Sequence, residues 1–124
     1  MPYDPWIHAD QLGLHVIEGN PGKGNRGLWA GNGIIIIRPG LTCIQFRCTL
    51  AHEIVHAEYD PPIIPRHLSP KAEAKADRIA AERLIDRKEF SRLAEMYPDN
   101  PAQLAFELGV TPKLLDTFIK HHTP

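Results

Sequence analysis

Residues 50–60 read LAHEIVHAEYD, in which His52 and His56 stand four residues apart and Glu53 directly follows the first histidine. Apolar residues at helical spacing around them predict a helix from about residue 44 to residue 59. One turn takes about 3.6 residues, so both imidazoles project from one face and can bind one metal ion. Glu53 lies about 100° round the axis, where it can reach a water on that ion without being a ligand.

A motif this short can arise by chance, so a third metal ligand is needed to support a metal site. Random placement would produce it about 0.02 to 0.03 times in a chain of this composition. Two histidines alone do not complete a zinc site, which needs another protein group and an open position for water. A second long helix can supply that group, because Ser69 and Pro70 form a start signal for a helix that runs to about residue 86.

The second predicted helix carries a carboxylate on its inward face. Glu73 shares one stripe with Ala76, Ala80 and Leu84. A buried carboxylate is costly unless it is paired or binds metal, so Glu73 is the predicted third ligand. Asp77 follows one turn later and can accept the second imidazole N–H of a ligating histidine. The alternatives are a solvated Glu73 in the first helical turn and a surface ion pair of Asp77 with a neighbouring cation.

Composition and charge exclude several classes of protein. The chain has 124 residues and 43% hydrophobic residues, which suits one globular domain rather than a disordered chain. A net charge of −1 offers no global basic field for nucleic acid or an anionic membrane. The longest apolar run, Ile34–Ile37, is too short to span a bilayer, and the N-terminus shows no signal peptide. Cys43 and Cys48 are therefore expected to be reduced and buried, with a disulfide and zinc ligation as the alternatives.

The remaining segments predict an α+β fold. A short strand ends the segment 2–18, and residues 28–40 read as two strands around the turn GNG. The second of these strands, with its four isoleucines, either lies at a sheet edge and pairs with extended substrate or is buried in the centre. After the proline-rich segment 60–70 come the second long helix, a third helix and two short helices around GVTP. One domain over 1–124 is expected, in three parts: a sheet region 1–43, metal-site helices 44–97 and a helical hairpin tail 98–124.

Two stretches carry a resemblance to a known family. FRCTLAHEIVHAEYD and EAKADRIAAERLID are similar to the ImmA/IrrE metallopeptidases, whose pattern is a strand or hairpin, then H-E-x-x-H, then E-x-x-A-[ND]-x-[FW]-A-A-x-x-L. The similarity covers about residues 27 to 86, with Ile79 in place of the usual aromatic residue and Asp86 close to a usual proline. The resemblance implies a small antiparallel or mixed sheet packed on zincin-like helices. It also implies a gluzincin-like zinc site with His52, His56 and Glu73 as ligands.

The resemblance further implies a role in regulation, because many members cleave or inactivate a helix-turn-helix repressor encoded nearby, often on phages or mobile elements. We therefore expect Zn²⁺ as cofactor, a DNA-binding repressor as protein substrate, no membrane partner, and the cytoplasm of a bacterial host as location. Zinc chemistry assigns Glu53 as the general base that takes a proton from the attacking water and passes it to the leaving amine. His67 and Tyr59 are candidates for steadying the oxyanion, with packing or surface exposure as the alternative for both.

Two alternatives to an enzyme stay open. A zinc-stabilised module could inactivate a repressor without cleaving it. A helix-turn-helix places small, turn and core residues where the C-terminal segment has Ala105, Gly109 and Leu115. The second helix of that segment offers only Lys113 and Lys120 as cations, with Asp116 between them, which is a poor footprint for phosphate. We therefore expect a helical hairpin that covers the core, or a docking surface for a partner protein, rather than direct DNA binding.

Overall fold

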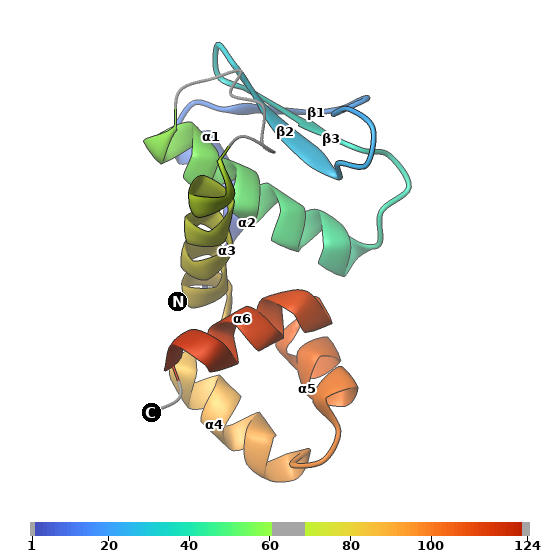
Figure 1. Ribbon diagram of the computed structural model, residues 1–124, viewed down its shortest axis with the longest axis vertical. Coiled ribbons are helices and arrows are strands. Elements are labelled where there is room, and N and C mark those ends of the chain that lie inside the picture. The colour runs from blue at the N-terminus through green and yellow to red at the C-terminus, as the bar shows by residue number, and fades with distance from the viewer. Residues whose placement is uncertain (1, 61–68, 123–124) are drawn as a thin grey trace.

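The computed structural model describes residues 2–60 and 69–122, which form six helices and one three-stranded sheet (Figure 1). The elements in chain order are α1 (Pro5–Gln11), β1 (His15–Glu18), β2 (Gly27–Gly31), β3 (Ile34–Ile37), α2 (Cys43–Tyr59), α3 (Pro70–Leu84), α4 (Arg87–Met96), α5 (Pro101–Leu108) and α6 (Pro112–His122). The sheet lies at one end of the molecule, α2 and α3 in the middle, and α4 to α6 at the other end (Figure 1). This is the predicted α+β architecture. Every helix in the described ranges is too short or too polar to cross a lipid bilayer.

The sheet is mixed, in the strand order β1-β3-β2. β3 pairs with β2 in the predicted hairpin and with β1 in parallel. Asn32 and Gly33 turn the hairpin with φ values of 53° and 74°, the left-handed conformation that a tight two-residue turn requires. β3 is therefore the central strand, and the alternative that its isoleucines form a sheet edge is wrong. Ile35 and Ile37 have no exposed surface, because α2 covers the side of the sheet to which they point.

Helix α2 connects the two hydrophobic cores of the protein. It begins with a capping box, in which the Gln45 N–H donates to Thr42 Oγ1 (3.1 Å) and the Thr42 N–H donates to Gln45 Oε1 (3.0 Å). One face of α2, with Leu50 and Ile54, packs against the isoleucines of β3. Another face, with Cys48, belongs to a second core that α3 to α6 complete. The rigid placement of α2 between two cores fixes the direction of every side chain on it.

Both cysteines are free thiols, but only one is buried. Cys48 is 6% exposed within the helical core, whereas Cys43 is exposed at the first position of α2. The expectation that Cys43 is buried is therefore wrong. The physical reason is that Cys43, the first residue of α2, belongs to neither core, whereas Cys48 lies on the face of α2 that packs into the helical core.

Helix α3 lies close against α2 because its buried face is built from alanines. Ala76, Ala80 and Ala81 are at most 1% exposed. On its other side α3 packs against α6, so the C-terminal hairpin of α5 and α6 closes the helical core as predicted. The Arg47 Nη1 of α2 donates to the carbonyl oxygen of Gly109 (2.7 Å), which attaches the turn of this hairpin to α2. The metal-site helices and the hairpin therefore form one packed unit.

Helix α1 is the one described helix that we did not predict. The Asp4 side chain accepts hydrogen bonds from the backbone N–H groups of Trp6 and Ile7 at 2.9 and 3.3 Å, and Pro5 occupies the first helical position. The seven residues of α1 are too few to establish a helical period in the sequence. The strand that follows, β1, lies within the segment where we predicted a strand.

Candidate metal centre

Three side chains from α2 and α3 bring their donor atoms together. The Nε2 atoms of His52 and His56 are 3.1 Å apart. Glu73 places Oε2 3.0 Å from the first nitrogen and Oε1 2.8 Å from the second. The two rings are steeply inclined, at 73°, so both nitrogens can point to one position. The structure thus brings together the three residues that the sequence suggested as ligands.

Each histidine ring is held from behind by a carboxylate. The His52 Nδ1–H donates to Asp77 Oδ1 at 2.8 Å, and the His56 Nδ1–H donates to Asp60 Oδ2 at 2.6 Å. A proton fixed on Nδ1 leaves the Nε2 lone pair free for a metal, and such carboxylates are the usual partners of ligating histidines. Asp77 lies where its sequence position suggested. Asp60 was missed, although its spacing of four residues from His56 was a readable signal.

The donor set fits a zinc ion. With both Nδ1 atoms protonated, two nitrogen lone pairs and a carboxylate point at one another, an arrangement that repels itself unless a cation lies between them. Four ligands at zinc distances of about 2.0–2.2 Å are about 3.3–3.6 Å apart in a tetrahedron. The two Nε2 atoms are 3.1 Å apart, and each lies 3.0 or 2.8 Å from a different oxygen of Glu73, which is only slightly closer. Two imidazoles and one carboxylate also leave a fourth position for water, as catalytic zinc sites require.

Protonation shows how strongly the site attracts positive charge. Burial acts to lower the pKa of His52, but its hydrogen bonds with Asp77 and Glu73 outweigh burial and raise the pKa to about 9. Burial also acts against charge on His56, and Glu73 and Asp60 raise its pKa in the same way. Burial acts to raise the pKa of Glu73, but the hydrogen bonds from both histidines hold it well below its usual range. The three side chains therefore stabilise a positive charge among them, whether a proton or a metal ion supplies it.

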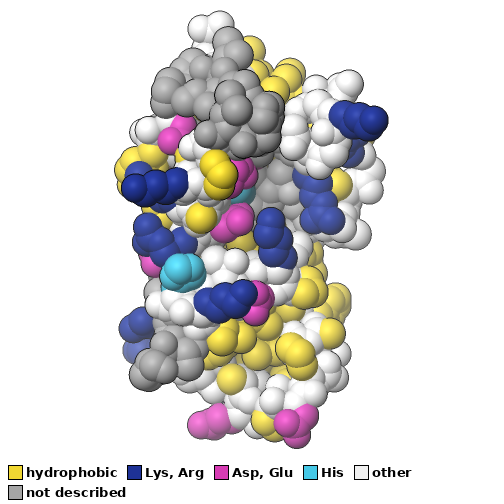
Figure 2. All heavy atoms as spheres, viewed as in Figure 1, with side chains coloured by type: hydrophobic (Ala, Val, Ile, Leu, Met, Phe, Trp, Pro, Cys, Tyr) yellow, Lys and Arg dark blue, Asp and Glu magenta, His cyan; other side chains and the backbone are white. Residues whose placement is uncertain are grey.

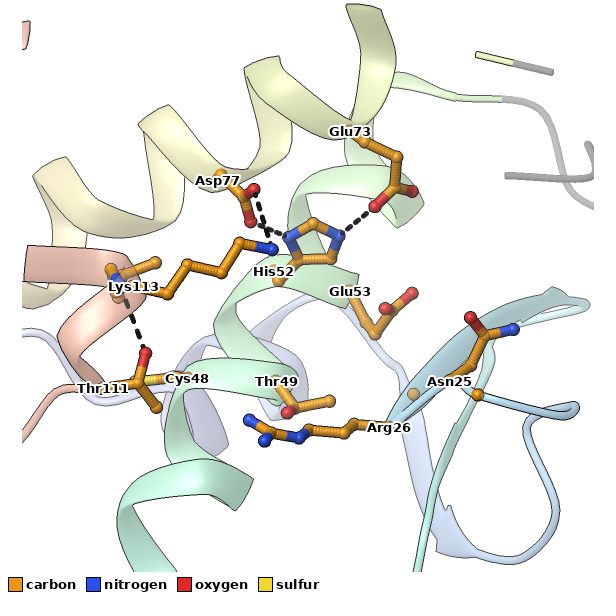
Figure 3. A pocket seen from close by; sticks show the side chains of 13 residues that line it. Asn25, Arg26, Cys48, Thr49, His52, Glu53, Glu73, Asp77, Thr111 and Lys113 are labelled. Carbon is orange, nitrogen blue, oxygen red and sulfur yellow. Dashed lines mark hydrogen bonds and ion pairs between the residues drawn. The ribbon is translucent and has the colours of Figure 1, made fainter. Parts of the chain in front are cut away.

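Glu53 lies beside these donors, at the wall of an open cavity. Glu53 is 1% exposed, yet it borders a cavity of about 400 Å³ together with His52 and Glu73. In Figure 3, Glu53 and Glu73 project from α2 and α3 on the same side of His52. The carboxylate is thus placed where a water on the metal could give up a proton, without joining the three donors.

Gly27 allows the sheet to approach Glu53. A Cβ atom at this position would lie 2.6 Å from Thr49 Cγ2 and 3.0 Å from Glu53 Cγ. Any residue larger than glycine in β2 would therefore push the strand away from α2 or displace the carboxylate. Sequence reasoning missed this role, because the pattern before the metal motif shows only a glycine at the end of a turn-rich loop.

Of the two candidates for oxyanion stabilisation, Tyr59 lies in the described part of the chain and does not border the cavity. Tyr59 is 52% exposed near the end of α2, and the Lys75 Nζ lies 4.0 Å from its ring centroid. Tyr59 is absent from the residues that border the cavity in the described part of the chain. His67 lies outside the described residues. The role assigned to each stays a prediction.

Comparison with known proteins identifies the family. The model of the IrrE N-terminal-like domain, peptidase family M78, matches residues 9–120. The chain belongs to this family. The matched range covers the sheet, both metal-site helices and the hairpin of α5 and α6, so the IrrE N-terminal-like fold accounts for nearly all the elements described above. Its members are metallopeptidases, and the donors of α2 and α3 give this member a candidate metal site. No curated protein matches the chain.

Proposed function

We propose that this protein is a zinc-dependent endopeptidase in which His52, His56 and Glu73 bind the metal and Glu53 is the general base. One observation carries the proposal: three metal donors converge within 4.8 Å of one another at a cavity that Glu53 also borders. A purely structural zinc site would more often close its fourth position with Cys or His. Cys48 borders the same cavity, but it does not join the group of donors.

The residues of the chain divide the catalytic work. Zinc, when bound, supplies Lewis acidity that activates water and polarises the scissile carbonyl. Glu53 accepts the proton of the attacking water and later delivers it to the leaving amine. Asp77 and Asp60 keep the histidine rings in the tautomer and orientation that binding requires. Gly27 lets β2 close over Glu53 and restrict the motion of its carboxylate.

We further propose that the substrate is a regulatory protein, namely a helix-turn-helix repressor of a phage or mobile element in the bacterial cytoplasm. Support for this comes from the resemblance of the metal motifs to the ImmA/IrrE metallopeptidases. The structure also speaks against a DNA-binding role for the hairpin. Helix α6, which would enter the DNA groove in a helix-turn-helix protein, packs instead against α3.

The decisive experiment combines the protein with a candidate repressor encoded beside its gene, with and without a chelator. Glutamine is nearly the size of glutamate and is a good helix former, so Glu53→Gln should keep both fold and zinc. Its cleavage rate should fall by a factor of about 10² to 10⁴, the usual contribution of a positioned acid–base group. Zinc would be measured by mass spectrometry and cleavage by gel and peptide mapping.

The same variant separates cleavage from sequestration. If Glu53→Gln with zinc bound inactivates the repressor as well as the wild type does, the protein acts as a binding module and the peptidase mechanism fails. If His52→Ala, which removes a ligand, cleaves normally, the assignment of the metal site fails instead.

A further inference from the structure

Cations as well as carboxylates border the cavity beside the candidate metal site, and Figure 2 shows side chains of both charges close together on this face of the molecule. Arg26 reaches it from the residue before β2, and Lys113 reaches it from the first turn of α6. Figure 3 shows Lys113 extending toward Asp77 and Arg26 extending toward Thr49. These two cations come from segments far apart in the sequence, and the packing of α6 on α3 brings Lys113 to the cavity that Arg26 also borders.

Neither cation is fully used by the protein. The Lys113 Nζ lies 3.7 Å from Asp77 Oδ2, which is long for an ion pair, and the Lys113 side chain is 82% exposed. The other Asp77 oxygen is held by His52 at the shorter distance of 2.8 Å. Arg26 is exposed, and its guanidinium has no side-chain hydrogen bond or ion pair with residues 2–60 or 69–122. Both positive charges are therefore available to a molecule that enters the cavity.

The rest of the cavity is suited to a short polar side chain. Thr49 and Thr111 border it, as does the apolar residue Leu114. Its volume of about 400 Å³ lies within the range of small-ligand pockets. A divalent ion on the donors would offset two of the three carboxylate charges of Glu53, Glu73 and Asp77, which weakens the repulsion of an incoming anion. Arg26 and Lys113 then decide which side chain binds best.

We propose that this cavity is a specificity subsite for an aspartate or glutamate side chain adjacent to the scissile bond, with Arg26 and Lys113 as the residues that determine specificity. This rests on the proposed peptidase function. The planar guanidinium of Arg26 can bind a carboxylate through two parallel hydrogen bonds, and Lys113 adds a point charge from the first turn of α6. The hairpin of α5 and α6 thus serves as one wall of the substrate site.

The first test reads cleavage positions. The zinc-loaded protein is incubated with a proteome-derived peptide mixture, and mass spectrometry records the residues around each cleaved bond. Two exposed charge pairs predict an enrichment of Asp and Glu by about three- to thirty-fold at one position next to that bond. The enrichment should fall in Arg26→Gln and in Lys113→Gln and disappear in the double variant. Lys120→Gln is the matched control, because this α6 lysine is paired with Asp116 at 2.9 Å and does not border the cavity.

A second measurement does not depend on cleavage. Two short peptide hydroxamates, identical except for an aspartate or an asparagine next to the metal-binding group, are titrated into the zinc-loaded protein. The aspartate form should bind about three- to thirty-fold more tightly, and this preference should vanish in the double variant and shrink at high salt.

The outcomes separate the two proposals. Equal affinity for both hydroxamates, or a preference that survives the double variant, overturns the acidic subsite even if cleavage is observed. Wild-type protein that binds the aspartate form preferentially but cleaves no peptide supports the subsite and counts against the peptidase. Cleavage without enrichment of acidic residues supports the peptidase and overturns the subsite.

Discussion

The close approach of β2 to α2 at Gly27 makes one substitution informative about both stability and catalysis. In Gly27→Ala the new methyl group would lie 2.6 Å from Thr49 Cγ2, where carbon atoms normally stay about 3.5–4.0 Å apart. It would also lie 3.0 Å from Glu53 Cγ and 3.2 Å from Ile37 Cδ1. Thr49 is β-branched and stiff in a helix, and Ile37 is fully buried, so neither can yield easily.

The expected cost follows from this overpacking. Adding one carbon to a well-packed position typically costs about 1–3 kcal/mol. For a domain of this size, each kcal/mol lowers the melting temperature by about 3–6 °C. Part of the strain should reach Glu53 as a displacement of its stem, and a shift of about 1 Å in a catalytic group can cost about 100-fold in rate. Gly27→Ala should therefore melt about 3–18 °C lower and lose most of its activity while retaining zinc.

Thermal unfolding, metal analysis and peptide cleavage measure these effects, and two further variants identify their cause. Gly19→Ala is the matched control, because its Cβ would meet only Ile36 Cγ2, at 3.3 Å. Thr49→Ser removes the methyl group that makes the shortest contact, so Gly27→Ala/Thr49→Ser should regain most of the lost stability. Activity should recover less than stability, because the contact with Glu53 remains.

Wild-type stability and activity in Gly27→Ala would show that β2 does not press on Glu53. Strictly additive effects in the double variant would show that Thr49 is not the residue in the way.

Three other predictions follow from the side chains around the metal donors and from one buried phenol. Asp60→Asn and Asp77→Asn should each weaken zinc binding by about 10- to 100-fold in competition with a chelator, whereas unchanged affinity would show that neither carboxylate orients its histidine. Because the pKa of His52 is raised to about 9, zinc must displace a proton from this imidazole below that pH. The apparent affinity for zinc should therefore rise with pH, by up to about tenfold per unit, and level off above pH 9. Calorimetry in two buffers would detect the proton release. Burial raises the pKa of Tyr3 to about 12 although Arg83 acts to lower it, so the folded state favours the neutral phenol. This contribution to stability is complete below about pH 10 and is lost as the pH rises toward 12. Tyr3→Phe should therefore remove this pH dependence of the free energy of unfolding.

The metal-site helices were readable from the sequence because their information is local. Helical spacing places His52 and His56 on one face, and the same spacing places Glu73 and Asp77 together on the next helix. The alanines of α3 further indicated that the two helices lie close together. The one assumption was that the face with the histidines lies against the face with Glu73. It was made because a carboxylate buried among alanines needs a partner or a metal ion.

What the sequence did not reveal depends on contacts between distant segments. The strand order places β3 between β1 and β2. The sequence did not reveal this, because a run of four isoleucines suits an edge strand as well as a central strand. The role of Gly27 appears only when β2 lies against α2. Lys113 reaches Asp77 across 36 positions of the chain, an approach that the packing of α6 on α3 creates and no local pattern encodes.

The hairpin of α5 and α6 shows why a sequence pattern can predict packing without predicting function. Gly109 adopts the left-handed conformation that a sharp turn between two helices needs, and Ala105 and Leu115 are buried in the helical core. A helix-turn-helix needs small, turn and apolar residues at these positions for the same reason, because they hold its two helices together. DNA binding requires in addition that the second helix be presented to the groove with its cations free for phosphate. Here α6 packs against α3, Lys113 faces the cavity beside Asp77, and Lys120 is paired with Asp116. The packing residues of the pattern therefore build a hairpin. Because this hairpin packs against α3, it forms one wall of the cavity at the candidate metal site.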